Sequence, residues 1–199
     1  MMTIHLELLP TIAVAAIVIS WLAFALVFIT RKQSPKSPDK KRDPRSVKGI
    51  VIQGLSFGVA WGAHRSYFTP LVRGPYALEA TLSIIAIVLA VASVVFTMMA
   101  VRVLGKEWSL TARVVEGHKL ATHGPYSLVR HPIYTGMLGM LLATGLAVSF
   151  WPALIISVVI FFIGTVIRIR IEEGLLREMF GVEYDDYARR VSAVVPGIY

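Results

Sequence analysis

Residues 124–136 read Gly-Pro-Tyr-Ser-Leu-Val-Arg-His-Pro-Ile-Tyr-Thr-Gly and stand directly before a long apolar run. The stretch gathers one Arg, one His and two Tyr within thirteen residues. In a hydrophobic chain, ionisable side chains beside a membrane segment are costly and usually serve a function. We therefore expect chemistry at this point, where the chain enters a membrane helix.

The composition is that of a membrane protein. Of the 199 residues, 56% are hydrophobic and 16% are charged, and the mean hydropathy is +0.69. This is more apolar surface than one soluble core of this size can bury. The net charge of +8 comes from basic residues between the apolar runs, which favours anionic lipid over a nucleic-acid partner. Without cysteine, the chain has no disulfides and no thiolate sites.

Hydropathy predicts an all-α, polytopic membrane protein with five transmembrane helices in a single domain, residues 1–199. The first apolar run follows a segment without Lys or Arg and precedes no cleavage-site pattern, so we interpret it as a retained helix rather than a signal peptide. Pro152 suits the first turn of a new helix, which makes the last two runs a helical hairpin. The five predicted spans are 10–29, 49–63, 77–101, 133–149 and 151–167.

Charge predicts the orientation of these spans. The loop 30–48 carries eight Lys or Arg against two Asp, which marks it as cytoplasmic by the positive-inside rule. The N-terminus is then outside, and the C-terminus and the regions 102–134 and 168–199 are cytoplasmic. In the second span, Gly54, Gly58 and Gly62 recur every four residues, which favours close helix packing, with a groove for a lipid tail as the alternative.

Several common chemistries are not supported by the sequence. No two His are spaced i,i+4 and no carboxylate is interleaved at a zinc-like distance, so we expect no metal site. The chain has no G-x-S-x-G motif for a serine nucleophile. It also has no GxGxxG motif, so a nucleotide-like cofactor would have to bind without a Rossmann unit.

Two motifs separated by the apolar hairpin carry a resemblance to a known family. The first is G-x-Y followed by R-H-P-x-Y-x-G within residues 124–136; the second is R-x-x-x-E-E at 168–173 followed by F-G-x-x-Y-x-x-Y at 180–187. This pattern resembles the isoprenylcysteine carboxyl methyltransferase family and, more widely, integral-membrane phospholipid methyltransferases. It covers roughly the C-terminal half of the chain.

The resemblance implies that S-adenosyl-L-methionine is the methyl donor and binds at the cytoplasmic ends of the last helices. It makes Arg168 and Glu172 the catalytic residues, with Arg168 also binding the carboxylate of the substrate. The residues that it implies for cofactor binding are His118, Lys119, Leu120, Ala121, Tyr126, His131, Pro132, Ile133, Tyr134 and Glu172.

These roles are chemically reasonable. The rings of Tyr126 and Tyr134 can pack on adenine or on a sulfonium cation, and Glu172 can neutralise an ammonium group. Structural alternatives stay open: both tyrosines can anchor at the membrane interface, the histidines can cap helices or contact headgroups, and Arg168 can pair with Glu172 or reach headgroups.

Two charged pairs are also spaced to stabilise a helix. Arg168 and Glu172, and Glu173 and Arg177, are each four residues apart and hence neighbours on a helix. We therefore expect Glu173 and Arg177 chiefly to stabilise the helix, with contact to Arg168 as the alternative for Glu173.

We therefore predict methyl transfer to the carboxylate of a lipid-like acceptor, with the C-terminal carboxylate of an isoprenylated cysteine as the favoured substrate. The further partners are membrane lipids. The alternatives are N-methylation of a phospholipid or other lipid amine, and a non-catalytic lipid-binding protein that retains the pattern as scaffold.

Overall fold

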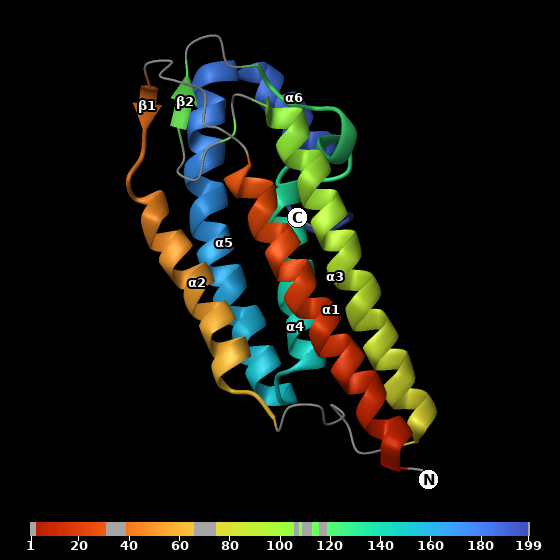
Figure 1. The fold of residues 1–199 in the computed structure, drawn as a ribbon. Coiled ribbons are helices and arrows are strands. Elements are labelled where there is room, and N and C mark those ends of the chain that lie inside the picture. Colours follow the sequence, from red (N-terminus) through yellow and green to blue (C-terminus); the bar gives the residue numbers. More distant parts are fainter. Residues whose placement is uncertain are drawn as a thin grey trace.

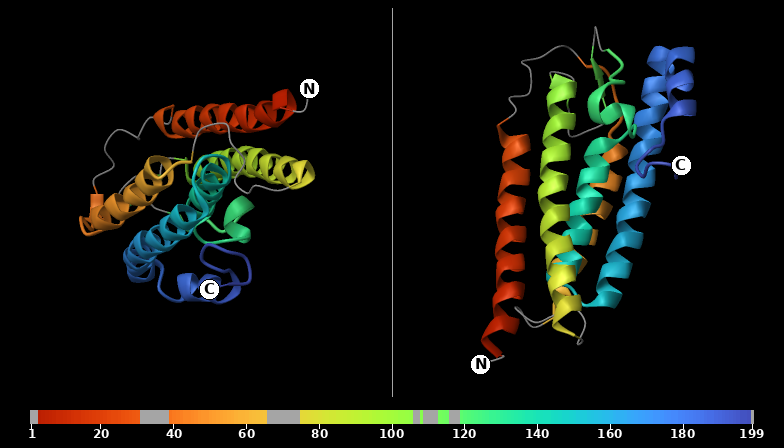
Figure 2. Two further views of the ribbon diagram at one scale, coloured as in Figure 1. Left: turned by 90° about the horizontal axis from the view of Figure 1, so that it is seen from below. Right: turned by 90° about the vertical axis from the view of Figure 1, so that its right-hand side faces the viewer.

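The computed structural model describes residues 3–30, 39–65, 75–105, 108, 113–115 and 119–198. Five long helices lie side by side as a bundle (Figures 1 and 2). They are α1 (Thr3–Ile29), α2 (Ser46–Gly62), α3 (Tyr76–Leu104), α4 (Pro132–Ala147) and α5 (Trp151–Phe180). The short helix α6 (Val182–Arg190) and the 3₁₀ turn η2 (Gly124–Ser127) complete the helical part.

The predicted all-α class is confirmed, and one short ladder accompanies the helices. Two short strands, β1 (Asp39–Arg42) and β2 (Arg113–Val115), form an antiparallel ladder in which Asp39 is opposite Val115 and Arg42 is opposite Arg113. The ladder joins the two segments that the charge pattern assigned to the same side of the membrane. It lies at the same end of the bundle as α6 (Figure 1).

Three helices are long and apolar enough to cross a membrane. They are α1, in its part Leu8–Ile29, and the whole of α3 and of α5. The two others have 17 and 16 residues, or roughly 25 Å at 1.5 Å per residue, somewhat less than a hydrocarbon core. The outer faces of the bundle are apolar, with exposed side chains such as Ile19, Val51, Val88 and Ile155. These features are those of an integral membrane protein, whereas the five-span topology stays a prediction.

The last long helix extends well beyond the predicted span 151–167. It continues to Phe180, because Arg168 with Glu172 and Glu173 with Arg177 form ion pairs one turn apart, 3.3 and 3.2 Å long. It ends at Gly181, whose φ of 54° suits glycine. The charged residues from Arg168 to Arg177, which lie beyond the predicted span, therefore belong to the same continuous helix.

Helix packing also differs from the prediction for α2. At Gly54, Gly58 and Gly62, no described atom lies within 4 Å of the position a Cβ would take, so this stripe does not pack against a helix. The close approach is between Gly49 of α2 and Gly164 of α5: a Cβ on Gly164 would lie 2.8 Å from the carbonyl oxygen of Gly49. The spacing of glycines did not reveal which face of α2 was buried.

Two apolar clusters hold the bundle together. One joins α1, α3 and α4 around Ile17, Ala90 and Met140, and the indole of Trp21 donates to the hydroxyl of Thr144 over 3.0 Å. The other joins α4 and α5 around Leu141 and Phe161 and includes Ala193 and Val194 of the C-terminal segment. The chain after α6 thus returns to the bundle, beside the start of α4.

Candidate active site

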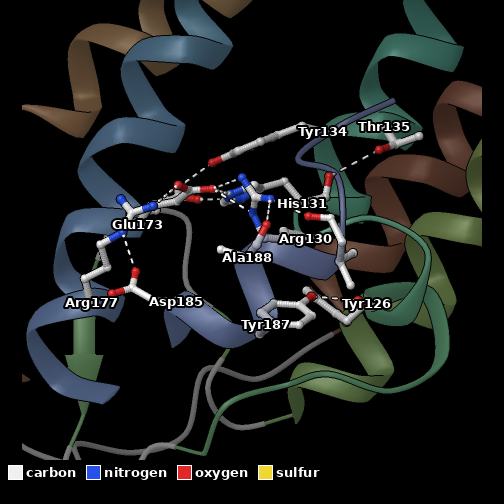
Figure 3. A network of polar contacts seen from close by, with 12 residues as sticks. Tyr126, Arg130, His131, Tyr134, Thr135, Glu173, Arg177, Asp185, Tyr187 and Ala188 are labelled. Carbon is white, nitrogen blue, oxygen red and sulfur yellow. Dashed lines mark hydrogen bonds and ion pairs between the residues drawn. The ribbon is translucent and has the colours of Figure 1, made fainter. Parts of the chain in front are cut away.

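The start of α4 is anchored by the C-terminal segment. The backbone N–H groups of Arg130 and His131 donate to the carbonyls of Ser192 and Ala193 over 2.8 and 2.9 Å. The hydroxyl of Thr135 donates to the carbonyl of Val194 over 2.6 Å. Residues 130–135 are therefore held in place by backbone contacts with a segment some sixty positions later (Figure 3).

Glu173 of α5 is the centre of a buried ionic network. Its Oε1 atom lies 2.9 Å from Nη2 of Arg130 and 3.2 Å from Nε2 of His131, and its Oε2 atom lies 3.2 Å from Nη2 of Arg177. Arg130 also donates from Nη1 to the carbonyls of Ala188 and Val191. This network joins α4, α5 and the chain around α6 into one rigid unit (Figure 3).

Glu172 forms a second, more open cluster beside the first. Its Oε1 accepts a hydrogen bond from the hydroxyl of Tyr134 and lies 3.3 Å from Nη2 of Arg168, and its Oε2 lies 3.5 Å from Nδ1 of His131. The side chain of Glu172 is 22% exposed, while those of Arg168 and Glu173 are 7% and 5% exposed. Glu172 is thus the carboxylate that a ligand can reach.

Tyr134 is enclosed by charged and aromatic neighbours. Its ring is nearly parallel to the imidazole of His131, with 5.5 Å between the ring centres, and the guanidinium carbon of Arg168 lies 5.0 Å from its centre. A ring that already contacts a guanidinium group gains stability from a cation–π interaction. The position of Tyr134 fixes its hydroxyl on Glu172.

Burial and charge act in opposite directions on His131. Burial by itself lowers the pKa of the imidazole, but the hydrogen bonds and charges of Glu172 and Glu173 outweigh it and raise the pKa above 6.5. The two carboxylates therefore favour the imidazolium more than water does, and in that form both ring nitrogens are donors. His131 links the two carboxylates.

A hydrogen bond joins Tyr126 and Tyr187 near the site. Tyr126 is buried in η2, and its carbonyl accepts a hydrogen bond of 2.6 Å from the hydroxyl of Tyr187. Burial raises the pKa of Tyr126 well above its usual value and raises that of Tyr187 to about 12. Both hydroxyls are therefore neutral hydrogen-bonding groups at physiological pH.

The structure brings some of the predicted site residues together and leaves others apart. Arg168, Glu172, His131 and Tyr134 form one cluster, and Pro132 and Ile133 follow His131 in the first turn of α4. Lys119, Leu120 and Ala121 lie on the approach to η2, where Lys119 is exposed and the other two are half-buried. His118 lies outside the described residues.

Two parts of the site were not predicted from the sequence. We had assigned Glu173 chiefly to helix stabilisation, and Arg130 received no role, although both belong to the quoted motifs. Their pairing joins positions 43 residues apart, which local spacing does not reveal. On α2, Gln53 reaches the cluster, with its Oε1 atom 3.5 Å from Nη1 of Arg168; the one signal for it was an amide within the apolar run 49–63.

Comparisons with known proteins place this geometry in context. Residues 80–183 match the model of a family described as phospholipid methyltransferase, which is just over half of the chain. A probable protein-S-isoprenylcysteine O-methyltransferase of Oryza sativa subsp. indica is 31% identical over 118 residues, which are 58% of this chain and 62% of the rice protein.

A second plant relative is more similar over a shorter stretch. The protein-S-isoprenylcysteine O-methyltransferase B of Arabidopsis thaliana is 37% identical over 81 residues, which are 41% of each chain. The chain therefore spans about three fifths of the length of the rice relative and two fifths of the Arabidopsis relative.

Proposed function

Because this chain belongs to the phospholipid methyltransferase family, we propose that it transfers a methyl group to the carboxylate of a lipid-like acceptor, with a C-terminal isoprenylated cysteine as the favoured substrate. The plant relatives are named for O-methylation of protein isoprenylcysteine, which supports a carboxylate acceptor. The product would be a methyl ester.

The observation that carries the proposal is the pairing of Arg168 and Glu172 on successive turns of α5. Arg168 is buried and positively charged, and the carboxylate beside it is partly exposed. This arrangement offers a cationic group to an anionic acceptor and an anionic group to a cationic methyl donor within one cluster.

The residues fit S-adenosyl-L-methionine as that donor. When bound, this cofactor supplies an electrophilic methyl group on a sulfonium centre. Within the described residues, Oε2 of Glu172 has one long contact, 3.5 Å from Nδ1 of His131, so it retains capacity to accept hydrogen bonds from the donor's ammonium group. In the proposal the cofactor is held by Glu172 together with His118, Lys119, Leu120, Ala121, Tyr126, His131, Pro132, Ile133 and Tyr134.

The proposed roles of the other residues follow from their contacts. A carboxylate is already nucleophilic at neutral pH, so the reaction needs positioning and exclusion of water rather than a general base. Arg168 binds and orients the acceptor carboxylate, and a guanidinium with five N–H donors can serve that group and Glu172 together. Tyr134 keeps Glu172 in place through its hydroxyl.

A lipid amine is the second candidate acceptor, since the family is described by phospholipid methylation. An amine must lose a proton before it can attack, whereas the contacts of Arg168 favour an anion.

We further propose that five helices cross the membrane, with the N-terminus outside and the site at the cytoplasmic end.

Binding of labelled S-adenosylmethionine to the detergent-purified chain tests the proposal. We expect saturable binding to the native protein, loss of binding in Glu172→Ala, and native binding in Glu183→Ala, which removes an exposed carboxylate from α6. Methyl transfer to a prenylcysteine analogue and to phosphatidylethanolamine then identifies the acceptor. No binding by the native chain would exclude the enzyme, and methylation of the amine alone would exclude the carboxylate.

A further inference from the structure

Gln53 is a polar side chain buried within the helix bundle. It lies on α2, it is 1% exposed, and its Nε2 atom donates to the hydroxyl of Thr165 on α5 over 2.8 Å. Its Oε1 atom faces Nη1 of Arg168 at 3.5 Å. Polar groups buried among apolar helices are costly unless they are satisfied, and they commonly mark functional positions.

The close approach of α2 and α5 places the amide of Gln53 beside Thr165 and Arg168. A Cβ on Gly164 would lie 2.8 Å from the carbonyl oxygen of Gly49 and 2.9 Å from the backbone nitrogen of Gln53. Two glycines therefore bring the helix backbones close enough for a Gln side chain to reach both Thr165 and Arg168. Larger residues would separate the helices.

The orientation of the amide follows from hydrogen-bond chemistry. A guanidinium group can only donate, so the oxygen of Gln53 faces Arg168 and the nitrogen faces Thr165. Because Thr165 fixes the amide, the acceptor oxygen has one defined position relative to Arg168.

We propose that Gln53 is a positioning residue that holds the guanidinium of Arg168 for the acceptor carboxylate, and that its lack of charge keeps the site selective for an anion. The inference rests on the proposed function and deepens it, because it assigns part of acceptor recognition to α2. The family match at residues 80–183 does not include this helix.

The contacts of Arg168 explain why a neutral residue at position 53 favours an anionic acceptor. Glu172 and Tyr134 contact the guanidinium from α5 and α4, and Gln53 contacts it from α2. Because Gln53 is neutral, it contacts the guanidinium of Arg168 without adding a second carboxylate to that of Glu172. A glutamate at position 53 would supply that second carboxylate from within the protein and compete with the acceptor.

A purely structural role is the alternative outcome. Hydrogen bonds between helices in a membrane stabilise their packing, so the bond between Gln53 and Thr165 would then affect stability alone. The two roles differ in the kinetic constant that changes. Loss of packing lowers thermal stability and the affinity for both ligands, whereas loss of positioning affects the acceptor.

The experiment compares five variants by cofactor Kd, by acceptor KM and kcat with a prenylcysteine analogue, and by thermal stability. Gln53→Glu keeps the shape but adds a charge, and Gln53→Met keeps the length but removes the amide. Thr165→Val removes the hydroxyl that fixes the amide, and Thr165→Ser retains it. Ser56→Ala is the control, because Ser56 is buried on the same helix and bonds to the carbonyl of Gln53 within α2.

We expect Gln53→Glu to raise the acceptor KM by about tenfold or more and to leave the cofactor Kd unchanged. The new carboxylate competes for Arg168, and an acceptor that loses a hydrogen bond to this charged group binds more weakly by about that factor. Gln53→Met and Thr165→Val should lower kcat/KM for the acceptor, while Thr165→Ser and Ser56→Ala behave as the native chain. An active native chain whose Gln53 variants keep the native acceptor KM, or lose cofactor and acceptor affinity together, overturns this inference alone. A native chain that methylates no carboxylate overturns the proposed function and this inference with it.

Discussion

The Nε2 atom of His131 lies 3.2 Å from the Oε1 atom of Glu173, which connects the residue just before α4 to the polar end of α5. The same oxygen contacts Nη2 of Arg130 at 2.9 Å. Two consecutive glutamates on α5 therefore have different tasks: Glu173 closes a buried network, and Glu172 faces a more open cluster.

Glu173→Gln should destabilise the protein strongly. The substitution leaves Arg130 buried without the carboxylate that it pairs with and removes one of the two carboxylates that contact His131. Breaking a buried pair typically costs about 3–5 kcal/mol. Thermal unfolding in detergent measures the effect. Asp186→Asn is the control, because it removes an exposed ion pair with Arg189, for which we expect about 0–1 kcal/mol. Equal stability of the two variants would contradict the network.

The stability of the protein should fall as the pH rises through the pKa of His131. Burial lowers this pKa, and Glu172 and Glu173 raise it by more, so the folded value lies above 6.5. The stabilisation is then complete below about 6.5, the unfolded value, and is lost as pH rises through the folded pKa. Thermal midpoints from pH 6 upward check this. His131→Gln should remove that part of the pH dependence, and an NMR titration that finds a pKa below 6.5 would refute the prediction.

Arg168→Ala should retain binding of S-adenosylmethionine but lose turnover, because the cation binds the acceptor and Glu172 binds the donor in our proposal. Arg168→Lys keeps the charge but loses the planar fork, so we expect weak activity with a raised acceptor KM. Cofactor binding and single-turnover methylation distinguish the steps. Equal loss of cofactor binding and of methylation would show that Arg168 has a structural role.

Gly164→Ala should destabilise the bundle, while Gly58→Ala should not. The added Cβ at Gly164 would lie 2.8 Å from the backbone oxygen of Gly49, so the helices must move apart, at a cost of about 1–3 kcal/mol. At Gly58, no described atom lies within 4 Å, and alanine favours a helix by up to about 1 kcal/mol. Thermal unfolding of both variants in the same detergent checks the predicted direction of each change in stability.

Single cysteines can test the proposed orientation, because the native chain has none. Ser127 in η2 and Trp151 at the start of α5 are both exposed. η2 lies beside the C-terminal end of α3, whereas α5 begins beside the C-terminal end of α2, at the other end of the bundle (Figure 1). With a membrane-impermeant maleimide, we expect Ser127→Cys to react only from the cytoplasmic side and Trp151→Cys only from outside. The reverse pattern would invert the topology.

Much of the helical architecture is predictable from local sequence. Long apolar runs and Pro132 and Pro152 at helix starts indicate where α4 and α5 begin, because these signals act within a few residues. The pairs Arg168–Glu172 and Glu173–Arg177 were also predicted from i,i+4 spacing and are confirmed. The end of α5 was missed, because hydropathy marks the end of an apolar run rather than the end of a helix.

The apolar helices, the charged motifs and their family can be recognised in the amino-acid sequence alone, since composition and short motifs need no tertiary contact. Three features appear only in the folded chain: Glu173 closes the network with Arg130 and His131, Glu172 stays accessible, and Gln53 reaches Arg168. These contacts join residues from 42 to 115 positions apart. They depend on the helix faces that close packing brings together. Of two glycines in the same apolar run, Gly49 packs against α5, whereas no described atom lies within 4 Å of the Cβ position of Gly58.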